Sequence, residues 1–256
     1  MDHRINPEIL NLMPCFMSPS LRFLLVKYGG GIIQASGSMA GNTFAHNRFG
    51  NYVRARTKPV NPMSPLQMAA RNRIMMLAEQ WRTDPMDDLI RGAWETYAKG
   101  VNWHNRLGEV KILTGFNHFI RSNAALIAAG GSLITAGPPD IGLPAGDDKF
   151  VVTGSATSGE LTITCDETKD WFMEPGAYLS VEMGRPQNAS RNFFGGPYRN
   201  AGAIAGEEDP GPTPPHVLTA PFTLVATQKV WCRARIIRAD ARCSTFFGAA
   251  PFAVGA

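Results

Sequence analysis

The sequence lacks every short motif that marks a common catalytic centre. It contains no G-x-S-x-G elbow, no G-x-x-x-x-G-K-[ST] phosphate loop and no H-E-x-x-H zinc motif. Its five histidines are scattered, and none stands at a familiar spacing from a cysteine or a carboxylate. We therefore expect a protein without enzymatic activity that holds no metal ion and no cofactor.

Cysteine is scarce, and long apolar runs are missing. The chain has four cysteines in 256 residues and no C-x-x-C pair, which argues against a zinc site. The uncharged stretch 122–139 is interrupted by glycines and a Pro-Pro pair, so we expect no membrane-spanning segment. The apolar start of the chain is broken by prolines and makes a poor signal peptide. This pattern favours assembly inside a cell or delivery by another route.

Negative charge is absent from one long segment. No acidic residue lies between Glu8 and Glu79, although that segment carries eight lysines and arginines. The net charge of +4 therefore divides into +7 over residues 1–130 and −3 over residues 131–256. Such a segment is suited to polyanions or to acidic protein surfaces, and a solvated basic face is the alternative.

What is present favours a folded protein made of short elements. Hydrophobic residues make up 44% and charged residues 18%, which is enough apolar material for a core and too little charge for a disordered chain. The 26 glycines and 19 prolines favour many turns over long helices. The length allows one or two domains.

The first part of the chain predicts an extended arm followed by a basic β-ribbon. We expect the arm over residues 1–28, and a ribbon that alternates apolar and polar residues around a turn at residues 47–50. A two-stranded ribbon is marginal alone and needs a partner. Its bases and aromatics suit either nucleic acid or an acidic protein neighbour, and we favour the protein. The candidate contact residues are Arg48, Tyr52, Arg54, Arg56, Lys58, Arg71 and Arg73.

Three short helices are expected in the middle of the chain. Ser64, Asp84 and Thr114 can each cap a helix, and prolines follow the first two at the first helical position. In the first helix, apolar residues recur at helical spacing. The predicted stripe is Leu66, Ala70, Ile74, Leu77 and Trp81.

After the candidate linker at residues 137–139, the period of the sequence switches to two. Leu161, Ile163 and Cys165 alternate with threonines, and further strands follow between Gly/Pro-rich loops. We therefore predict an α+β protein whose last part is an antiparallel β-sandwich of the fibronectin-III or immunoglobulin kind. The expected divisions are an arm over 1–28, a basic β-ribbon with a three-helix docking region over 29–136, and an acidic sandwich over 137–256.

Cys165 and Cys232 fall on the inward faces of two predicted central strands. Immunoglobulin domains place their inter-sheet disulfide at such positions, so these two residues are candidates for a disulfide. The alternative is a pair of buried free thiols, which is the usual state in a reducing cell and the one we favour.

Several segments resemble uncharacterised proteins of tailed bacteriophages and prophages. The resemblance covers about residues 29–245 and is most specific in the ribbon. Its residues there are Gly41, Phe44, Asn47, Arg48, Gly50, Tyr52, Arg54, Arg56, Pro59, Asn61, Pro62 and Gln67. It continues in Trp81 and Trp94 and in the segments 113–117, 194–199 and 238–242. The resemblance implies a virion structural or accessory protein of the head or tail, assembled in the host bacterial cytoplasm, and it implies no activity.

These observations lead to one main hypothesis and two alternatives. The basic ribbon is expected to dock on other virion subunits and on further copies of this chain, with the helices as a spacer. A nucleic-acid-binding accessory protein is the first alternative. The second is a host-surface or carbohydrate-binding module, for which Trp171, Tyr178 and Trp231 would be the platforms.

Overall fold

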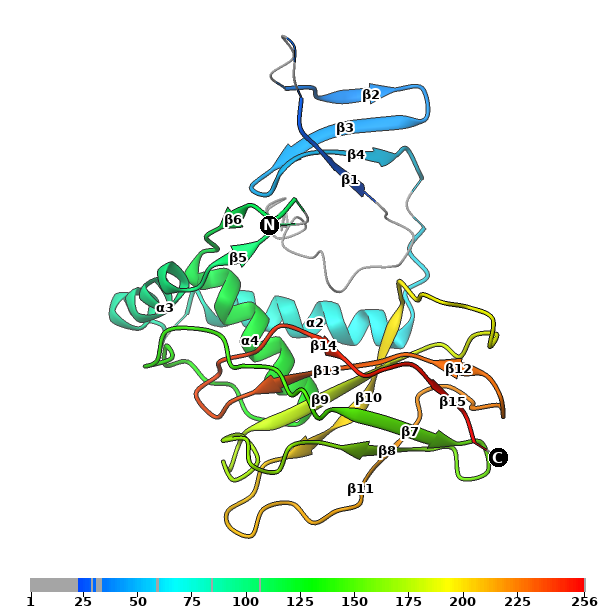
Figure 1. The fold of residues 1–256 in the computed structure, drawn as a ribbon. Helices are drawn as coiled ribbons and strands as arrows, with labels where there is room; N and C mark the ends of the chain where they lie inside the picture. Colours follow the sequence, from blue (N-terminus) through cyan, green and yellow to red (C-terminus); the bar gives the residue numbers. More distant parts are fainter. Residues whose placement is uncertain are drawn as a thin grey trace. The chain divides into compact units, whose positions relative to one another are not determined.

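The chain folds into two compact units of mixed helix and strand. The computed structural model describes residues 23–28, 30, 34–58, 60–83, 85–105 and 107–255 (Figure 1). One unit comprises residues 1–76 with 101–113, and the other comprises residues 77–100 with 114–256. Over the described ranges the protein is α+β, with three helices and several antiparallel sheets.

The first unit contains a four-stranded antiparallel sheet with the order β1-β4-β3-β2. Its strands are β1 (Phe23–Val26), β2 (Gly37–Met39), β3 (Asn42–Asn47) and β4 (Gly50–Ala55). The predicted ribbon is present as the β3–β4 hairpin, and the strands β1 and β2 extend it on either side. β1 pairs along the other side of β4, from Phe23 opposite Arg54 to Val26 opposite Asn51. The last part of the predicted arm is therefore a strand, and residues 1–22 of that arm lie outside the described residues.

A second hairpin and the first helix complete the elements assigned to this unit. The hairpin joins β5 (Trp103–His104) and β6 (Val110–Lys111). Helix α2 (Pro65–Gln80) begins directly after Ser64, as predicted, and the Gln67 N–H donates to Ser64 Oγ at 3.4 Å. Residues 65–76 of α2 belong to the first unit and residues 77–80 to the second.

The predicted apolar stripe of α2 is confirmed in part, because Ala70, Ile74 and Trp81 are half-buried and Leu77 is buried. Only Leu77 and Ala78 are buried in this helix, and Leu66 at the start of the stripe is 69% exposed. Exposed Met75 and Met76 show that other apolar side chains of the helix lie outside this stripe.

Two helices of the second unit cross closely. α3 (Asp88–Gly100) begins at Asp88 and not at Pro85, because Asp87 supplies the cap and its Oδ1 accepts from the Ile90 N–H at 2.8 Å. The predicted cap Asp84 lies outside the described residues. α4 (Gly115–Ala129) begins after Thr114, as predicted. A Cβ on Gly115 would lie 2.7 Å from the α3 backbone, so glycine permits the close crossing.

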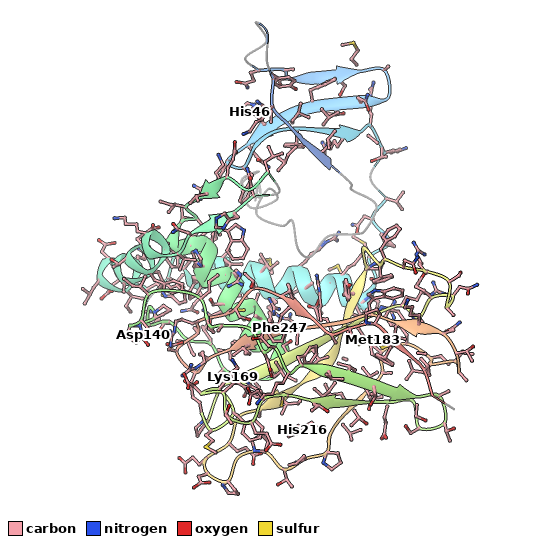
Figure 2. All side chains as sticks on the ribbon, in the orientation of Figure 1. His46, Asp140, Lys169, Met183, His216 and Phe247 are labelled. Atoms are coloured by element: carbon pink, nitrogen blue, oxygen red, sulfur yellow. The ribbon has the colours of Figure 1, made fainter. Side chains whose placement is uncertain are left out.

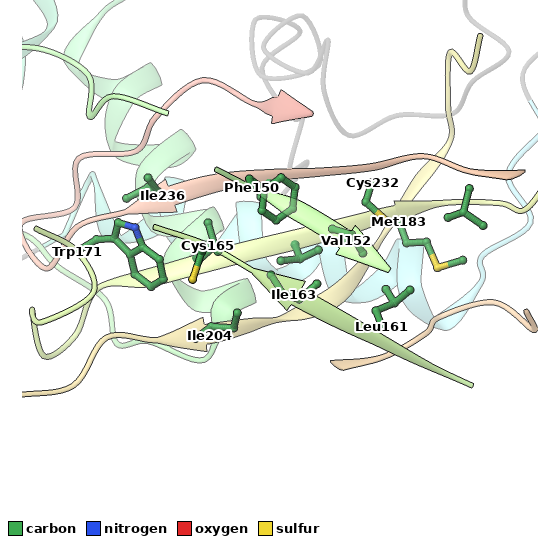
Figure 3. Close-up of a cluster of buried hydrophobic side chains, with 14 of the residues drawn as sticks. Phe150, Val152, Leu161, Ile163, Cys165, Trp171, Met183, Ile204, Cys232 and Ile236 are labelled. Carbon is green, nitrogen blue, oxygen red and sulfur yellow. The ribbon is translucent and has the colours of Figure 1, made fainter. Parts of the chain in front are cut away.

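Two antiparallel sheets supply the main core of the second unit. Their orders are β11-β8-β7 and β10-β9-β13-β14, and β12 pairs with β15 beside them. The core receives Leu161 and Ile163 from one sheet and Val181 and Ala234 from the other, as Figure 3 shows in part. The strands are β7 (Val151–Ser155), β8 (Glu160–Thr164), β9 (Tyr178–Gly184), β10 (Tyr198–Ala205), β11 (His216–Thr219), β12 (Lys229–Val230), β13 (Cys232–Ile237), β14 (Phe247–Gly248) and β15 (Phe252–Ala253).

Helix α4 packs on the β10-β9-β13-β14 sheet, so α3 and α4 fold together with the strands of the second unit. Ala125 and Leu126 of α4 form a buried cluster with Ile237 and Cys243. The predicted division at residues 136/137 therefore lies inside the second unit.

The predicted linker at residues 137–139 is packed against the helices. The Asn123 side chain holds both backbone groups of Ile134, at 2.8 and 3.0 Å, and Trp94 Nε1 donates to Thr135 O at 2.7 Å. A Cβ on Gly137 would lie 2.7 Å from the Ala93 Cβ. Gly137 is thus required for a close contact with α3 and does not mark a free linker.

Candidate docking surface on the basic sheet

The tight turn of the β3–β4 hairpin exposes an arginine at its tip. Asn47 pairs with Gly50, which leaves a loop of Arg48 and Phe49. Asn47 Oδ1 accepts from the Phe49 N–H at 2.9 Å, and Gly50 has φ 123°, a conformation that glycine adopts readily. The turn predicted from the sequence is confirmed, and it holds Arg48 in solvent.

Tyr52 and Arg54 lie on the same face of β4, because side chains along a strand alternate between faces. The Arg56 N–H donates to Gly41 O at 2.8 Å, which continues the pairing past the end of the strand. Arg54 lies between Thr43 of β3 and Phe23 of β1 in the sheet. Arg54 and Arg56 are exposed and Tyr52 is half-buried.

Glu109 is the one acidic residue among the described residues of this unit, and its charge is already neutralised. Its carboxylate lies 2.6 Å from Lys27 Nζ and 3.6 Å from Lys111 Nζ, and it accepts from Asn105 Nδ2 at 3.0 Å. Hydrogen bonds from Lys27 and Asn105 lower the pKa of Glu109 below its ordinary value. Asn105 also donates to Phe49 O at 3.0 Å, so this cluster is anchored to the β3–β4 turn.

The remaining cations of the hairpin have no carboxylate to pair with in the described part of this unit. Within the described ranges, Arg48, Arg54, Arg56 and Lys58 form no ion pair. The first unit carries 11 lysines and arginines against 3 aspartates and glutamates, a net charge of +8. The second unit carries 14 against 18, a net charge of −4. The asymmetry between the two units is larger than the one between the two halves of the sequence.

Five of the seven candidate contact residues come from the hairpin and its continuation. We call them the basic hairpin, and they are Arg48, Tyr52, Arg54, Arg56 and Lys58. Arg71 and Arg73 lie on α2, where two positions correspond to about 200° of rotation, so they point to different sides of the helix. Both are half-buried, and we leave them out of the docking surface.

Sequence patterns missed Lys27, Asn105 and Glu109. The sequence did single out Glu109, because it is the one acidic residue between Glu95 and Asp140. Nothing in the local pattern indicated that it would meet Lys27, because that contact joins segments far apart in the chain.

Cys165 and Cys232 are free thiols, so the candidate disulfide is not formed. Both side chains are buried in the core between the two sheets. Burial raises the pKa of each thiol to about 12, and nearby Asp147 adds to the effect at Cys165.

Alkylation of the native protein is expected to leave Cys165 and Cys232 unmodified. At about pH 8 a pKa near 12 lowers the thiolate fraction roughly a thousandfold relative to an ordinary exposed thiol. Peptide mapping after iodoacetamide treatment measures this for each cysteine, and labelling in guanidinium chloride provides the fully reactive control. Rapid modification of either residue in the folded protein would contradict its burial.

The three proposed carbohydrate platforms do not present free rings. Trp171 is only 1% exposed and belongs to the core. Tyr178 packs against the cluster of α4 and Ile237. Trp231 is stacked on Phe194, with ring centroids 5.8 Å apart. Trp171 is therefore too buried to serve as a platform, and the half-buried Tyr178 and Trp231 each pack against neighbouring side chains.

No three or more His, Cys, Asp or Glu side chains gather at a metal-binding distance in the part of the chain that the structure describes. Among the helices of the described residues, none has the length and apolar character needed to cross a bilayer.

Comparison of this chain with protein-family models, with curated proteins and with solved structures finds no match. The fold and the site define a mixed α+β protein, in which one unit contains a strongly basic sheet and the other has a net negative charge and an apolar core between two sheets.

Proposed function

We propose that this chain is a non-enzymatic structural or accessory protein of a tailed-phage virion, which docks through its basic hairpin on acidic surfaces of head or tail subunits. The observation that carries the docking role is that Arg48, Arg54, Arg56 and Lys58 have no carboxylate partner among the residues that the structure describes. Glu109 cannot serve them, because two lysines already hold it. The resemblance of the ribbon to tailed-phage proteins supplies the biological setting.

We further infer that residues 150–255 form a sandwich of the fibronectin-III or immunoglobulin kind. The order of the strands supports this inference. The second strand, β8, lies between the first (β7) and the fifth (β11). Likewise β13 lies between β9 and β14, which corresponds to the Greek-key order of the two immunoglobulin sheets. β10 pairs with the outer side of β9, and a fourth strand at this position is typical of fibronectin-III domains.

Replacing Arg54 and Arg56 by alanine is expected to weaken binding to virion particles by about tenfold, because two exposed cations of the docking face are lost. Co-sedimentation of the purified protein with particles that lack it measures this effect. The matched control replaces Arg82 and Lys99, which are exposed cations of the second unit, and removes the same charge. Equal binding by the two double variants would refute docking through the basic hairpin.

A nucleic-acid-binding accessory role is the second candidate, and the placement of Tyr52 and Arg54 on one face favours it. An aromatic ring beside a guanidinium suits a stacked base next to its phosphate. Fluorescence anisotropy with a labelled single-stranded oligonucleotide distinguishes the two roles. Binding that falls steeply with salt and is lost in the Arg54/Arg56 variant would support nucleic acid. No binding at low salt would remove this candidate.

A further inference from the structure

The second unit has loops of opposite charge at the two ends of its strands. The end where β8 finishes at Thr164 and β9 begins at Tyr178 is called the acidic end. Segments 165–177 and 206–215 meet there, since the Glu207 N–H donates to Phe172 O at 3.2 Å. Loops 185–197 and 220–228 lie at the opposite, basic end. In Figure 2, Lys169 marks the acidic end and Met183 lies toward the basic end.

The acidic end exposes carboxylates that have no cationic partner within the described ranges. The other acidic groups nearby are paired, for example Asp166 with Lys149 at 3.0 Å and Glu174 with Arg238. Five exposed carboxylates form no ion pair with any residue that the structure describes. They are Asp148, Glu167, Glu207, Glu208 and Asp209. Lys169 is the single cation of segments 165–177 and 206–215, so negative charge predominates over these neighbouring loops.

The basic end holds cations against aromatic rings. No acidic residue occurs between Glu182 and Glu207, and Glu182 itself is paired with Arg233 at 2.6 Å. The cations Arg191, Arg199 and Lys229 each lie over an aromatic ring, at 5.6, 4.5 and 5.6 Å from its centroid. Such contacts orient a cation without cancelling its charge.

Phe193 projects from the basic end. Its side chain is 66% exposed, and the guanidinium of Arg191 lies over its ring. The neighbouring Phe194 stacks on Trp231. Its ring also lies so close to Gly184 that a Cβ at that position would clash with it, so Phe194 is packed closely onto the sheet. The loop is therefore fixed by Phe194 while it presents Phe193 to solvent.

The acidic end contains a hollow that suits such a ring. Its volume is about 180 Å³, and its lining includes Thr164, Glu167, Pro214, Pro215 and His216. An engineered apolar cavity of about 150 Å³ takes up benzene, so one aromatic ring fits this space. His216 is 7% exposed, and its Nε2 has no partner among the described residues.

We propose that the basic end of one copy docks on the acidic end of a second copy, with Phe193 in the hollow. The exposed prolines give the ring an apolar contact. Arg191 over the ring and the exposed Arg185 of the same loop then face Glu167 and the carboxylates of residues 207–209. Charge complementarity favours the basic end of a second copy as the partner of the acidic end, because two acidic ends or two basic ends would repel each other.

This contact joins different surfaces and therefore leads to a ring or to an open filament. It goes beyond docking through the basic hairpin, because it uses residues of the second unit alone. It also supplies a surface for the self-association expected of a virion subunit.

Two variants of the full chain test the contact by analytical ultracentrifugation. Phe193→Ser removes the ring, and Thr164→Trp fills the hollow from an exposed position on β8. Each variant alone is expected to self-associate about 30-fold more weakly than the wild type, the loss typical of an aromatic anchor. Leu89→Ser removes an exposed apolar side chain of α3 and is the matched control with unchanged association.

Mixing the two variants gives the decisive result. The intact Phe193 of the Thr164→Trp chain can enter the open hollow of the Phe193→Ser chain, so the mixture should form one-to-one pairs that do not extend. Absence of such pairs, or wild-type association by either single variant, overturns the proposal. Binding of a single-stranded oligonucleotide that is lost in Phe193→Ser, without any change in self-association, would assign the basic end to nucleic acid instead.

The Phe193→Ser substitution is also introduced into the Arg54/Arg56 double variant, so that the two proposed contacts can be measured separately. The loss of particle binding by the double variant reports on the basic hairpin, and the effect of Phe193→Ser within it reports on the contact between second units. Failure of either idea is therefore seen separately.

Discussion

Replacing Trp94 by alanine is expected to lower the free energy of unfolding by about 4 kcal/mol, the usual cost of truncating a fully buried tryptophan. Trp94 has no exposed surface, and its ring meets Phe119 and Tyr97 edge to face at centroid distances of 5.5 and 6.1 Å. Its Nε1 also donates to Thr135 O at 2.7 Å. The substitution would leave a large void between α3 and α4 and an unsatisfied carbonyl.

Urea unfolding followed by circular dichroism measures this change. Trp94→Phe keeps most of the apolar volume and loses the hydrogen bond, so its cost should be about 1 to 2 kcal/mol. Leu89→Ala, at an exposed position of the same helix, is the control with an effect near zero. A loss below about 1 kcal/mol for Trp94→Ala would mean that α3 and α4 do not pack around this ring.

Local signals were sufficient where a single segment decides its own structure. Ser64 and Thr114 cap α2 and α4 as their positions predict. The alternation at Leu161, Ile163 and Cys165 places these side chains in the core and the intervening threonines outside. Both features depend on neighbours only a few residues apart.

Partner choice could not be predicted, because it joins distant segments. The glycines and prolines at 137–139 are typical of a linker, yet Gly137 is needed there for a close approach to Ala93. Likewise Phe23–Val26 gave no sign that it would pair with β4, about thirty residues further along the chain. The charge of the basic hairpin was visible in sequence, but the neutralisation of Glu109 by Lys27 was not.

Acidification between about pH 6.5 and pH 4.5 is expected to lower the free energy of unfolding by about 2 kcal/mol through His118 alone. This α4 residue has no exposed surface, and neither ring nitrogen has a hydrogen-bond partner among the described residues. Burial, with a smaller effect of Arg121, lowers the pKa of His118 to about 4, against 6.5 for an exposed histidine. Between these values the unfolded chain binds more protons than the folded one, so stability is full above pH 6.5 and falls as the pH decreases.

Replacing His118 by leucine tests this origin of the pH dependence. Leucine cannot be protonated and loses no hydrogen bond, so the slope of stability over this range should largely disappear. The exposed His104 provides the control, since His104→Gln should retain the slope. Asp166 and Glu109 have lowered pKa values, so the stability that they contribute is lost mainly below about pH 4.5 and to the same extent in wild type and in His118→Leu. An unchanged slope in His118→Leu would show that His118 does not control the loss of stability in acid.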